Sequence, residues 1–384
     1  MNIEPSTPDE PSTPDELAEA VRSAPRVLAV GARTKPRLSA VGGETTLIST
    51  HRLSGITEYE PDEFTFTALA GTPVREIAAA LAEKGQYLPF DPMLVRSGAT
   101  IGGTVAAGLA GPGRHRFGGA RDFILGARFV DGRGRLLRVG GRVVKNAAGF
   151  DLPKFFTGSL GRFGVLAELT FKVFPRPAAA RTLRIPAEGI AAACDLFAAI
   201  GAARWEADAV DLPPEGDAVL IRIAAPEEAL DPLSDEIMGR FSGAALGAKE
   251  AEAAWWRLGE FEWAHADGEL LKVATTPAAL PALDAAVRAI AGARMHVSVA
   301  GNLAFVSLPP GAPAWKLPAL TLRGSGPLFP GAPPAPAIAA AVKAALDPEN
   351  RFPSLQQPVG LAPRPGKRAS NVQPHDETLP SPGC

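Results

Sequence analysis

The stretch SGATIGGTVAAGLAGPGRHRFGG, residues 97–119, contains eight glycines beside a basic cluster at Arg114, His115 and Arg116. Glycine has no Cβ, so it lets other groups approach the main chain closely and permits positive φ angles. The segment TIGGTVAAG (100–108) predicts the start of a helix whose first amides face an anion such as a diphosphate. The alternative is a flexible loop between core elements.

A second turn of the same character is GARTK (31–35), which follows the predicted strand VLAV. It offers bare amides, the hydroxyl of Thr34 and the charges of Arg33 and Lys35. The sequence has neither GxGxxG nor GxxxxGK[ST], which excludes the usual dinucleotide fingerprint and the P-loop. A third glycine-rich set, NAAGFDLPKFFTGSLGRFGVL (146–166), leads into a predicted strand. Two phosphate-compatible turns favour an anionic ligand over a plain loop.

Composition and charge narrow the class of protein. The chain has 384 residues, 46% of them hydrophobic, and a formal net charge of −2. The length and composition predict a globular protein of two domains. The small net charge excludes an electrostatic field of the whole molecule that would attract nucleic acid. There is no apolar run of 18 residues and no signal-peptide pattern, so we expect a cytoplasmic protein without a transmembrane segment. The only cysteines, Cys194 and Cys384, cannot ligate an iron–sulfur cluster, and no metal site is predicted.

Hydrophobic patterns divide the chain into two α+β parts. The first has strands at 27–31, 56–60, 64–70, 123–130, 135–140 and 164–174, and a helix at 72–85 with Thr72 as its N-cap. The second has strands at 181–186, 218–224, 270–276 and 303–309, and helices near 189–200, 227–241, 249–262 and 277–291. Strands and helices do not alternate strictly, which disfavours a doubly wound parallel sheet. We predict a disordered leader at 1–16, domains at 17–177 and 178–330, a helical segment at 331–361 that returns to the first domain, and a disordered tail at 362–384.

Four motifs in fixed order carry a family resemblance: GARTK, SGATIGGTVAAG, GRHRFGGARDFILGARFVDGRG and VVKNAAGFDLPKFFTGSLGRFGVLAELTFKVFPRP. Together they resemble the FAD-binding domain of the vanillyl-alcohol oxidase and p-cresol methylhydroxylase (PCMH) superfamily. Within it, they are most similar to the FAD-binding E subunits of bacterial glycolate oxidases, also called glycolate dehydrogenases. The resemblance covers residues 26–177. It implies an α+β fold in which a two-lobed PCMH-type domain precedes an α+β cap domain with an antiparallel sheet.

The resemblance also implies which residues hold the cofactor. The FAD pyrophosphate would lie against Gly31, Ala32, Arg33, Thr34 and Lys35 and against Gly98, Thr100, Ile101, Gly102 and Gly103. The ribityl chain or isoalloxazine would approach Ala106, Gly108, Gly113, Arg114 and Gly118, and the adenine would pass Gly164 and Val165. The turn 31–35 has no histidine or cysteine, so the FAD is expected to be non-covalent. The chain departs from the family at Phe117 and Phe150, which replace tyrosines, and at RFPSLQ (351–356), which replaces an ending like FNPGR.

The function that the resemblance implies is FAD-dependent oxidation of glycolate, a small 2-hydroxy acid, to glyoxylate. Its partners would be the related flavoprotein D subunit and the iron–sulfur F subunit, which would receive the electrons and place the chain peripherally at the inner membrane. One alternative is a stand-alone FAD-linked 2-hydroxy-acid oxidase or dehydrogenase. The other is a structural flavoprotein subunit that does not turn over.

Catalytic residues are not assigned by the sequence, which offers only candidates. Arg114 and His115 are placed to anchor a carboxylate or line an electron exit, or else they belong to a basic surface loop. His296, in ARMHVSVAGNLAFVSL (293–308), is what remains of a histidine- and glycine-rich cap motif, or it is a packed core histidine. Trp256, Glu260 and Trp263 have helical spacing that favours core or interface, and Cys194 lies in an apolar helix, which favours inert core.

Overall fold

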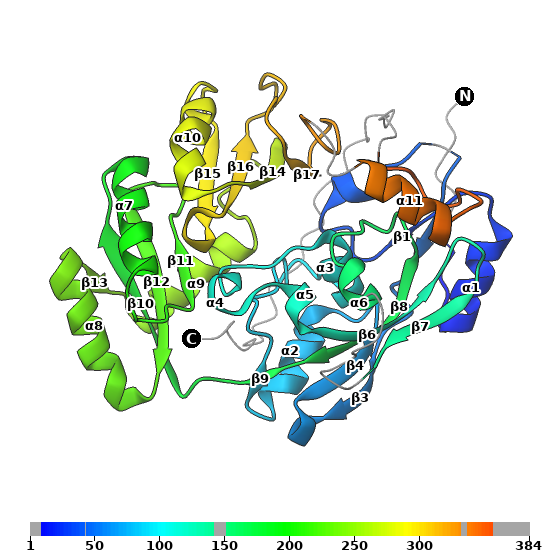
Figure 1. Cartoon of the computed structure of the whole chain (residues 1–384), viewed down its shortest axis with the longest axis horizontal. Coiled ribbons are helices and arrows are strands. Elements are labelled where there is room, and N and C mark those ends of the chain that lie inside the picture. The colour runs from blue at the N-terminus through cyan, green and yellow to red at the C-terminus, as the bar shows by residue number, and fades with distance from the viewer. Residues whose placement is uncertain (1–8, 43, 142–150, 332–335, 356–384) are drawn as a thin grey trace, which may run out of the picture.

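The computed structural model describes residues 9–42, 44–141, 151–331 and 336–355. Figure 1 shows two parts side by side, with the blue and cyan N-terminal part on the right and the green and yellow part on the left. The predicted tail at 362–384, residues 1–8 of the predicted leader and Phe150 all lie outside the described residues. No helix in the described part of the chain is long and apolar enough to cross a membrane.

The N-terminal part is built around an antiparallel sheet of five described strands in the order β3-β4-β8-β6-β7. Beside it lies the parallel pair β1-β2. The elements are α1 (Pro14–Ser23), β1 (Val27–Val30), η1 (Pro36–Ser39), β2 (Thr46–Ser49), β3 (Ile56–Glu60), η2 (Pro61–Glu63), β4 (Thr65–Leu69), α2 (Val74–Ala82), β5 (Gln86–Tyr87), α3 (Ile101–Ala107), α4 (Arg114–Phe117), α5 (Ala120–Phe123), β6 (Ile124–Val130), β7 (Leu136–Gly140), α6 (Leu152–Phe155), β8 (Val165–Lys172) and β9 (Phe174–Pro175). The predicted hairpins β3-β4 and β6-β7 are both present.

The leader predicted over residues 1–16 is too long, because residues from 9 onward pack on the first domain. Asp9 pairs with β2, its amide donating to Leu47 O at 3.2 Å. Helix α1 begins at Pro14 and is capped by Thr13, whose hydroxyl accepts the amide of Glu16. The prolines and acids of this segment, which predicted disorder, are the residues that start and cap a helix whose apolar face is buried.

The N-cap predicted at Thr72 is also wrong. Helix α2 begins at Val74, whose amide donates to Ala99 O at 2.8 Å. The Thr72 hydroxyl instead donates to Leu69 O at 2.6 Å and accepts the amide of Gly55 at 2.9 Å. A tertiary contact with the segment before α3 therefore replaces the local cap.

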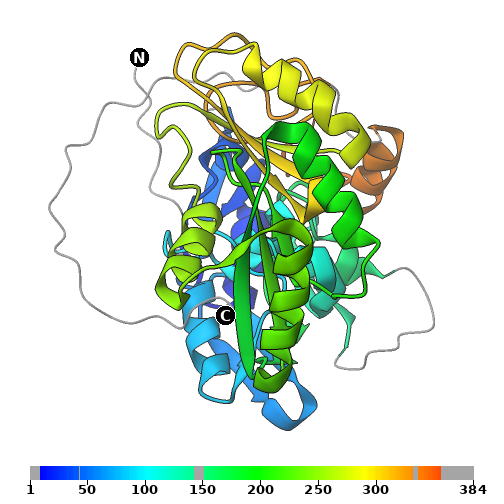
Figure 2. The same ribbon diagram turned by 90° about the vertical axis from the view of Figure 1, so that its left-hand side faces the viewer.

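The second part, the cap, contains two antiparallel sheets in the orders β11-β12-β10-β13 and β15-β16-β14-β17. Its elements are β10 (Ala179–Pro186), α7 (Gly189–Gly201), β11 (Ala209–Asp211), β12 (Ala218–Ala225), α8 (Glu227–Phe241), β13 (Ala244–Ala245), α9 (Ala248–Gly259), β14 (Glu269–Ala274), η3 (Pro277–Ala279), α10 (Leu280–Arg288), β15 (Arg294–Ser298), η4 (Val299–Gly301), β16 (Leu303–Leu308) and β17 (Leu320–Arg323). Leu212 and Val297 exchange backbone hydrogen bonds and join the two sheets. Figure 2 shows α7, α8 and α10 on the outer side of the cap.

The inner face of the cap packs on the first part through a shared apolar core. Leu109 and Leu160 of the first part cluster there with Phe261, Phe305 and Leu322 of the cap. Trp256 of α9 is buried within the hydrophobic core of the first part. The stripe predicted at 253–265 is thus an interface, and it brings the cap against the glycine-rich region.

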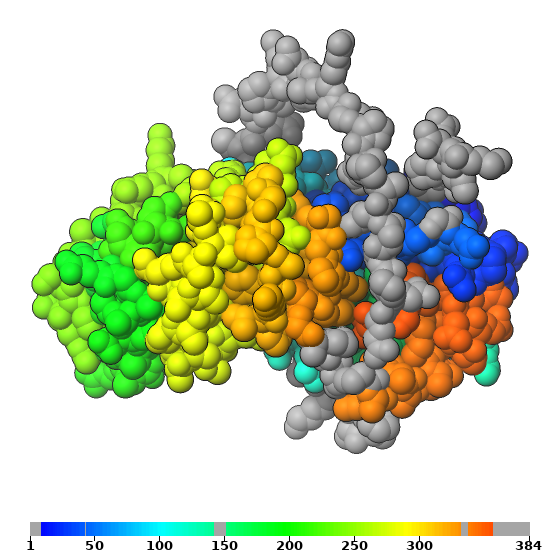
Figure 3. Space-filling view, turned by 90° about the horizontal axis from the view of Figure 1, so that it is seen from above, coloured from blue at the N-terminus to red at the C-terminus, as the bar shows by residue number. Residues whose placement is uncertain are grey.

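The C-terminal segment, α11 (Pro336–Leu346) and the residues after it, returns to the first part. Figure 3 shows the orange and red segment directly against the blue N-terminal segment, and Figure 1 shows α11 beside β1. The amide of Val27 in β1 donates to Arg351 O at 2.8 Å, and Phe352 is buried among residues of α1 and β1. Arg351 and Phe352, the first residues of RFPSLQ, therefore support the strand that leads into the turn 31–35 although this motif is unlike the family ending.

Asp347 holds this C-terminal segment in place. Its buried carboxylate accepts the Lys343 ammonium and the amides of Arg351 and Phe352. Removing one partner of a buried ion pair leaves the other charge uncompensated. We predict that Asp347→Ala lowers the free energy of unfolding by about 3 kcal/mol, measured by urea denaturation with circular dichroism. Asp284→Ala, in a more exposed pair on α10, serves as the control; an equal effect of both substitutions would contradict this assignment.

Candidate functional site

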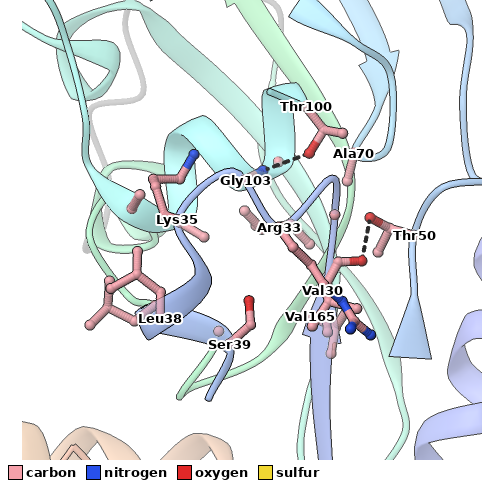
Figure 4. Close-up of a pocket in the computed structure, with 18 of the residues that line it drawn as sticks. Val30, Arg33, Lys35, Leu38, Ser39, Thr50, Ala70, Thr100, Gly103 and Val165 are labelled. Carbon is pink, nitrogen blue, oxygen red and sulfur yellow. Dashed lines mark hydrogen bonds between the residues drawn. The ribbon is translucent and has the colours of Figure 1, made fainter. Parts of the chain in front are cut away.

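The main cavity lies in the N-terminal part, where the ends of β1, α3 and β8 meet. It holds about 740 Å³ of empty space, including solvent at its mouth. Three segments supply most of its lining: the turn after β1 (residues 29–35), α3 with its cap (within 100–107) and the turn into β8 (within 159–166). Figure 4 shows Lys35, Thr100 and Gly103 along one end, and Leu38 and Ser39 across the cavity from Val30 and Val165.

The turn Gly31–Lys35 presents open main-chain donors to this cavity. Strand β1 ends at Val30, whose carbonyl accepts the amide of Thr50 at 2.9 Å. Arg33 then adopts a left-handed φ of 54°, which turns the chain away from the sheet. Among the described residues, no amide of residues 31–35 donates a hydrogen bond to the protein. Because no protein group accepts from these amides, they are available to a ligand in the cavity.

Lys35 adds a buried cation to the same turn. Its side chain is 7% exposed, and its ammonium donates to the Thr34 hydroxyl at 2.9 Å. Burial lowers the pKa of Lys35 to about 8, while the carboxylate of Glu260 acts in the opposite direction. A cation held mainly by one hydroxyl is an incomplete site, and an anion in the cavity would complete it.

Helix α3 contributes less through its amides than the sequence predicted. The amide of Ile101 donates to Thr72 O at 2.9 Å and that of Gly102 to Ala70 O at 2.8 Å. The amide of Gly103 reaches the hydroxyl of Thr100, the N-cap, at 3.2 Å. These protein partners already use the first donors of the helix. What α3 still contributes to the cavity is main chain that no side chain covers, at its glycines.

The glycines of this region have two different roles. A Cβ on Gly102 would lie 2.7 Å from Ala70 O, and one on Gly31 would lie 2.5 Å from Thr100 Oγ1, so these two glycines allow the elements to touch. A Cβ on Gly103 would meet nothing within 4 Å except Thr100 Oγ1 at 3.0 Å. Gly103 lines the cavity and keeps its wall flat for a ligand.

Several predicted cofactor residues do not line the cavity: Gly98, Ile101, Gly108, Gly113, Arg114 and Gly118. Gly108 ends α3 in the left-handed conformation. A Cβ on Gly113 would lie 2.1 Å from Pro89 O, and one on Gly118 would lie 2.3 Å from Asp122 Oδ2. These glycines allow tight packing within the protein. The structure places the other predicted positions, Gly31, Ala32, Arg33, Thr34, Lys35, Thr100, Gly102, Gly103, Ala106, Gly164 and Val165, around one cavity.

The basic cluster on α4 faces the cap. Arg116 has a structural role, because its guanidinium forms salt bridges with Asp208 at 2.9 Å and with Glu206 at 2.6 Å. His115 is half-buried; burial lowers its pKa, and the nearby carboxylates of Asp211 and Asp208 oppose this. Arg114 is exposed and has no ion pair with a described residue. Of the three described residues in this cluster, Arg114 and His115 therefore keep side chains without an ion pair.

His296 is a buried core residue. It is fully buried, and its Nε2 lies 2.7 Å from Asp211 Oδ2. The same carboxylate accepts the Ser298 hydroxyl at 2.9 Å and the amide of Val299 at 3.2 Å. Val299, Ala300 and Gly301 all have positive φ, which is strained for a β-branched residue such as Val299. The Asp211–His296 pair therefore lies beneath this turn and joins it to β11.

The sequence analysis missed Lys272, which projects from β14 of the cap. Its ammonium donates to Gly108 O at 2.6 Å, at the end of α3. Burial, together with the positive charge of Arg114, lowers the pKa of Lys272 to about 8. Lys272 shares a strand face with Leu270, which belongs to the inter-domain core. A lysine on the apolar face of LLKVATT was the signal available in the sequence.

The remaining predicted residues are structural in the described chain. Cys194 is half-buried in α7, and burial raises the pKa of its thiol, so it is not an activated nucleophile. Trp263 is buried beside His296. Glu260 is no core residue, since it bonds the loop before α3.

The segments that line the cavity lie within or next to a part of the chain that is similar to known proteins. The family model of the FAD binding domain matches residues 8–140. The glycolate oxidase subunit GlcE of Escherichia coli (strain K12) is 49% identical over 142 residues, which are 37% of this chain and 40% of that protein. The glycolate oxidase subunit GlcD of Bacillus subtilis (strain 168) is 32% identical over 162 residues, 42% of this chain and 34% of that protein. The matches thus span well under half the length of these relatives.

The likeness to solved structures is broader and concerns the fold. A structure of alkyldihydroxyacetonephosphate synthase superposes with a TM-score of 0.62 over 89% of this chain and 74% of that one, at 15% identity. This likeness and the family match confirm the predicted α+β fold with its PCMH-type domain.

The contrast between Gly102 and Gly103 predicts two different outcomes for the same substitution. Gly102→Ala forces a methyl group into Ala70 and is expected to lower the free energy of unfolding by about 1–3 kcal/mol. Gly103→Ala points into the cavity, and we expect it to stay within about 1 kcal/mol of the parent chain. Thermal and urea unfolding of both variants would measure this. Equal stability of the two variants would show that the helix is not packed on Ala70 as described.

Proposed function

Because this chain carries an FAD binding domain in residues 8–140, we propose that it is the FAD-binding subunit of an oxidoreductase of the glycolate oxidase kind. Its reaction would be the oxidation of a 2-hydroxy acid, glycolate, to the 2-oxo acid, glyoxylate. The similarity to GlcE and GlcD supports both the cofactor and the substrate class.

The observation that carries the proposal is the turn Gly31–Lys35, with its open amides and its buried cation. These groups would hold the diphosphate of FAD, since successive amides and an ammonium suit a doubly charged anion. Thr100 and Gly103 would flank the diphosphate on the other side, and Ala106 would lie further along the ligand. Gly164 and Val165 would border the adenine end. The turn offers no histidine or cysteine, so the cofactor would be held without a covalent bond.

When bound, FAD supplies the acceptor for the hydride of the substrate. The chain would bind the substrate at the domain junction near the end of α3, where Lys272 and Arg114 lie close enough for their charges to interact. Neither forms an ion pair with a described residue, so their charges would be available to the carboxylate of a small 2-hydroxy acid. His115, on α4 beside Arg114, is the candidate to accept the hydroxyl proton, because burial favours its neutral form.

The electrons would leave through partner subunits. With only Cys194 and Cys384, this chain cannot ligate a four-cysteine cluster. The proposed partners are a related flavoprotein subunit of the GlcD kind and a separate iron–sulfur subunit. The stand-alone oxidase considered from the sequence would need this chain to turn over without either partner.

A second candidate function is a flavoprotein subunit that binds FAD without turning over. The observation that favours it is the burial of His296, which leaves the cap without its motif histidine as a base. The two candidates differ in whether the flavin of this chain accepts electrons from the substrate.

The test is anaerobic reduction of the flavin. We expect the purified chain to be yellow. With its partner subunits, it should lose the visible absorbance of its oxidised flavin when glycolate is added. Gly103→Val is the matched negative control, because its branched side chain enters the cavity and blocks FAD loading while the fold remains. A colourless wild-type chain would contradict the assignment, and a flavin that stays oxidised during turnover would establish the second candidate.

The pKa of Lys35 predicts a pH dependence of FAD affinity. Below pH 8, Lys35 is already charged in the free chain, so the diphosphate binds at full affinity. Above pH 8, the free chain loses this proton, and the Kd for FAD is expected to rise by up to about tenfold per pH unit. Flavin fluorescence titrations between pH 6.5 and 9.5, a range of about 3 units around this value, would measure it.

Two variants define the control for this prediction. Lys35→Arg keeps a charge that does not titrate in the range, so its Kd should not change with pH. Lys35→Met should bind weakly at every pH. A wild-type Kd that is constant across the range would rule out Lys35 as a ligand of the diphosphate.

A further inference from the structure

The loop before α3 is held by the cap as well as by its own domain. Glu260, the residue that follows α9, accepts the amide of Arg96 at 2.8 Å and the amide of Ser97 at 3.0 Å. Its carboxylate also accepts the Ser97 hydroxyl at 2.7 Å. One carboxylate of the cap therefore binds three donors on consecutive residues of the first part.

Neighbouring contacts strengthen this attachment. The amide of Leu94 donates to Gly259 O at 3.0 Å. The guanidinium of Arg96 lies over the ring of Trp256, 4.1 Å from its centroid, in a cation–π contact. Since Trp256 is buried in the core of the first part, the last turn of α9, directly before Glu260, is fixed against this loop.

The loop held by Glu260 leads directly to the cofactor turn. Within the loop, the amide of Ala99 donates to Leu94 O at 2.9 Å, which closes it into one compact unit. Gly98 lies beside Ala32: a Cβ added to Gly98 would lie 4.0 Å from the Ala32 Cβ. Thr100 follows, caps α3, and approaches Gly31 closely. A displacement of residues 94–99 would therefore move both walls of the diphosphate site.

Glu260 also acts on the site through its charge. It is the carboxylate that opposes the effect of burial on Lys35 and favours the charged ammonium. The same residue thus supports the position of the turn and the protonation of its cation.

We propose that Glu260 is a positioning residue for the cofactor, which couples docking of the cap to the affinity of the first part for FAD. This inference rests on the proposed binding of FAD at the turn 31–35. The coupling is reciprocal, so bound FAD would in turn stabilise the docked cap. Glu260 itself touches neither the cofactor nor the substrate, and it acts through residues 94–99 and Lys35.

The experiment compares Glu260→Gln with Glu262→Gln in the full-length chain after removal of FAD. Glu262 is exposed, lies two residues away and loses the same charge, which makes it a matched control. We expect Glu260→Gln to raise the Kd for FAD about tenfold and Glu262→Gln to leave it unchanged. The amide cannot accept all three donors, and it no longer favours the charged form of Lys35.

The pH profile separates positioning from a general structural defect. Without the Glu260 charge, the pKa of Lys35 should fall below its wild-type value of about 8, so FAD affinity should decline from a lower pH. Glu260→Asp keeps the charge and should restore the wild-type pH profile in part. A general loss of stability would weaken binding without moving the profile, and that result would overturn the proposal.

Ser97→Ala keeps the test open if Glu260→Gln fails to fold. It removes the Ser97 hydroxyl, one of the three donors to Glu260, and should raise the Kd for FAD about threefold. An unchanged Kd in both Glu260→Gln and Ser97→Ala would overturn the inference. A wild-type chain that binds no FAD would instead overturn the proposed function, so the two failures are distinguishable.

Discussion

The structure depends on main-chain donors that the protein itself does not use. A lysine removed from water costs free energy, and main-chain donors without a protein partner add nothing to the stability of the fold. The turn Gly31–Lys35 has both features at the end of β1. Such a turn is stable only because β1 is fixed from other directions, by β2 on one side and by the C-terminal segment on the other. The rest of the first domain supports this single turn.

The cap is part of this support as well as a cover. Its apolar inner face packs on Leu109 and Leu160, and its polar residues reach the glycine-rich segment and its neighbours at several points. Lys272 binds the end of α3, Glu260 holds the loop before α3, and Arg222 forms a buried ion pair with Asp91, which also accepts the amide of Gly113. Polar contacts of this kind fix orientation, whereas the apolar contacts supply most of the stabilisation.

Local sequence patterns predicted the elements well because the information is local. The strand before GARTK, the hairpin at residues 124–140 and the helix after Thr100 all follow from alternation, turn residues and a capping threonine. The roles of the glycines could not be predicted in this way. Gly102 and Gly103 are adjacent and chemically identical, yet one contacts Ala70 and the other lines the cavity. Only the packing of distant segments distinguishes them.

The same limit applies to the polar residues. Thr72 has the sequence context of a helix cap, but its hydroxyl is used in a tertiary contact. Lys272 and Glu260 are far from the glycine-rich segment in the sequence, and nothing local indicates their partners there. His296 was a reasonable candidate from its motif, and its burial against Asp211 became visible only in the fold. Residues that act across the domain boundary are therefore the ones that sequence patterns miss.

The hydrogen bond between Val27 and Arg351 has a consequence for the order of events during synthesis. Strand β1 is made early, but the residue that accepts the amide of Val27 lies far along the chain, beyond the whole cap. On the ribosome, this contact cannot form until the residues around Arg351 have emerged. Cofactor uptake at the turn beyond β1 would then follow synthesis of the cap, and a chain that stops before Arg351 would leave β1 without this contact.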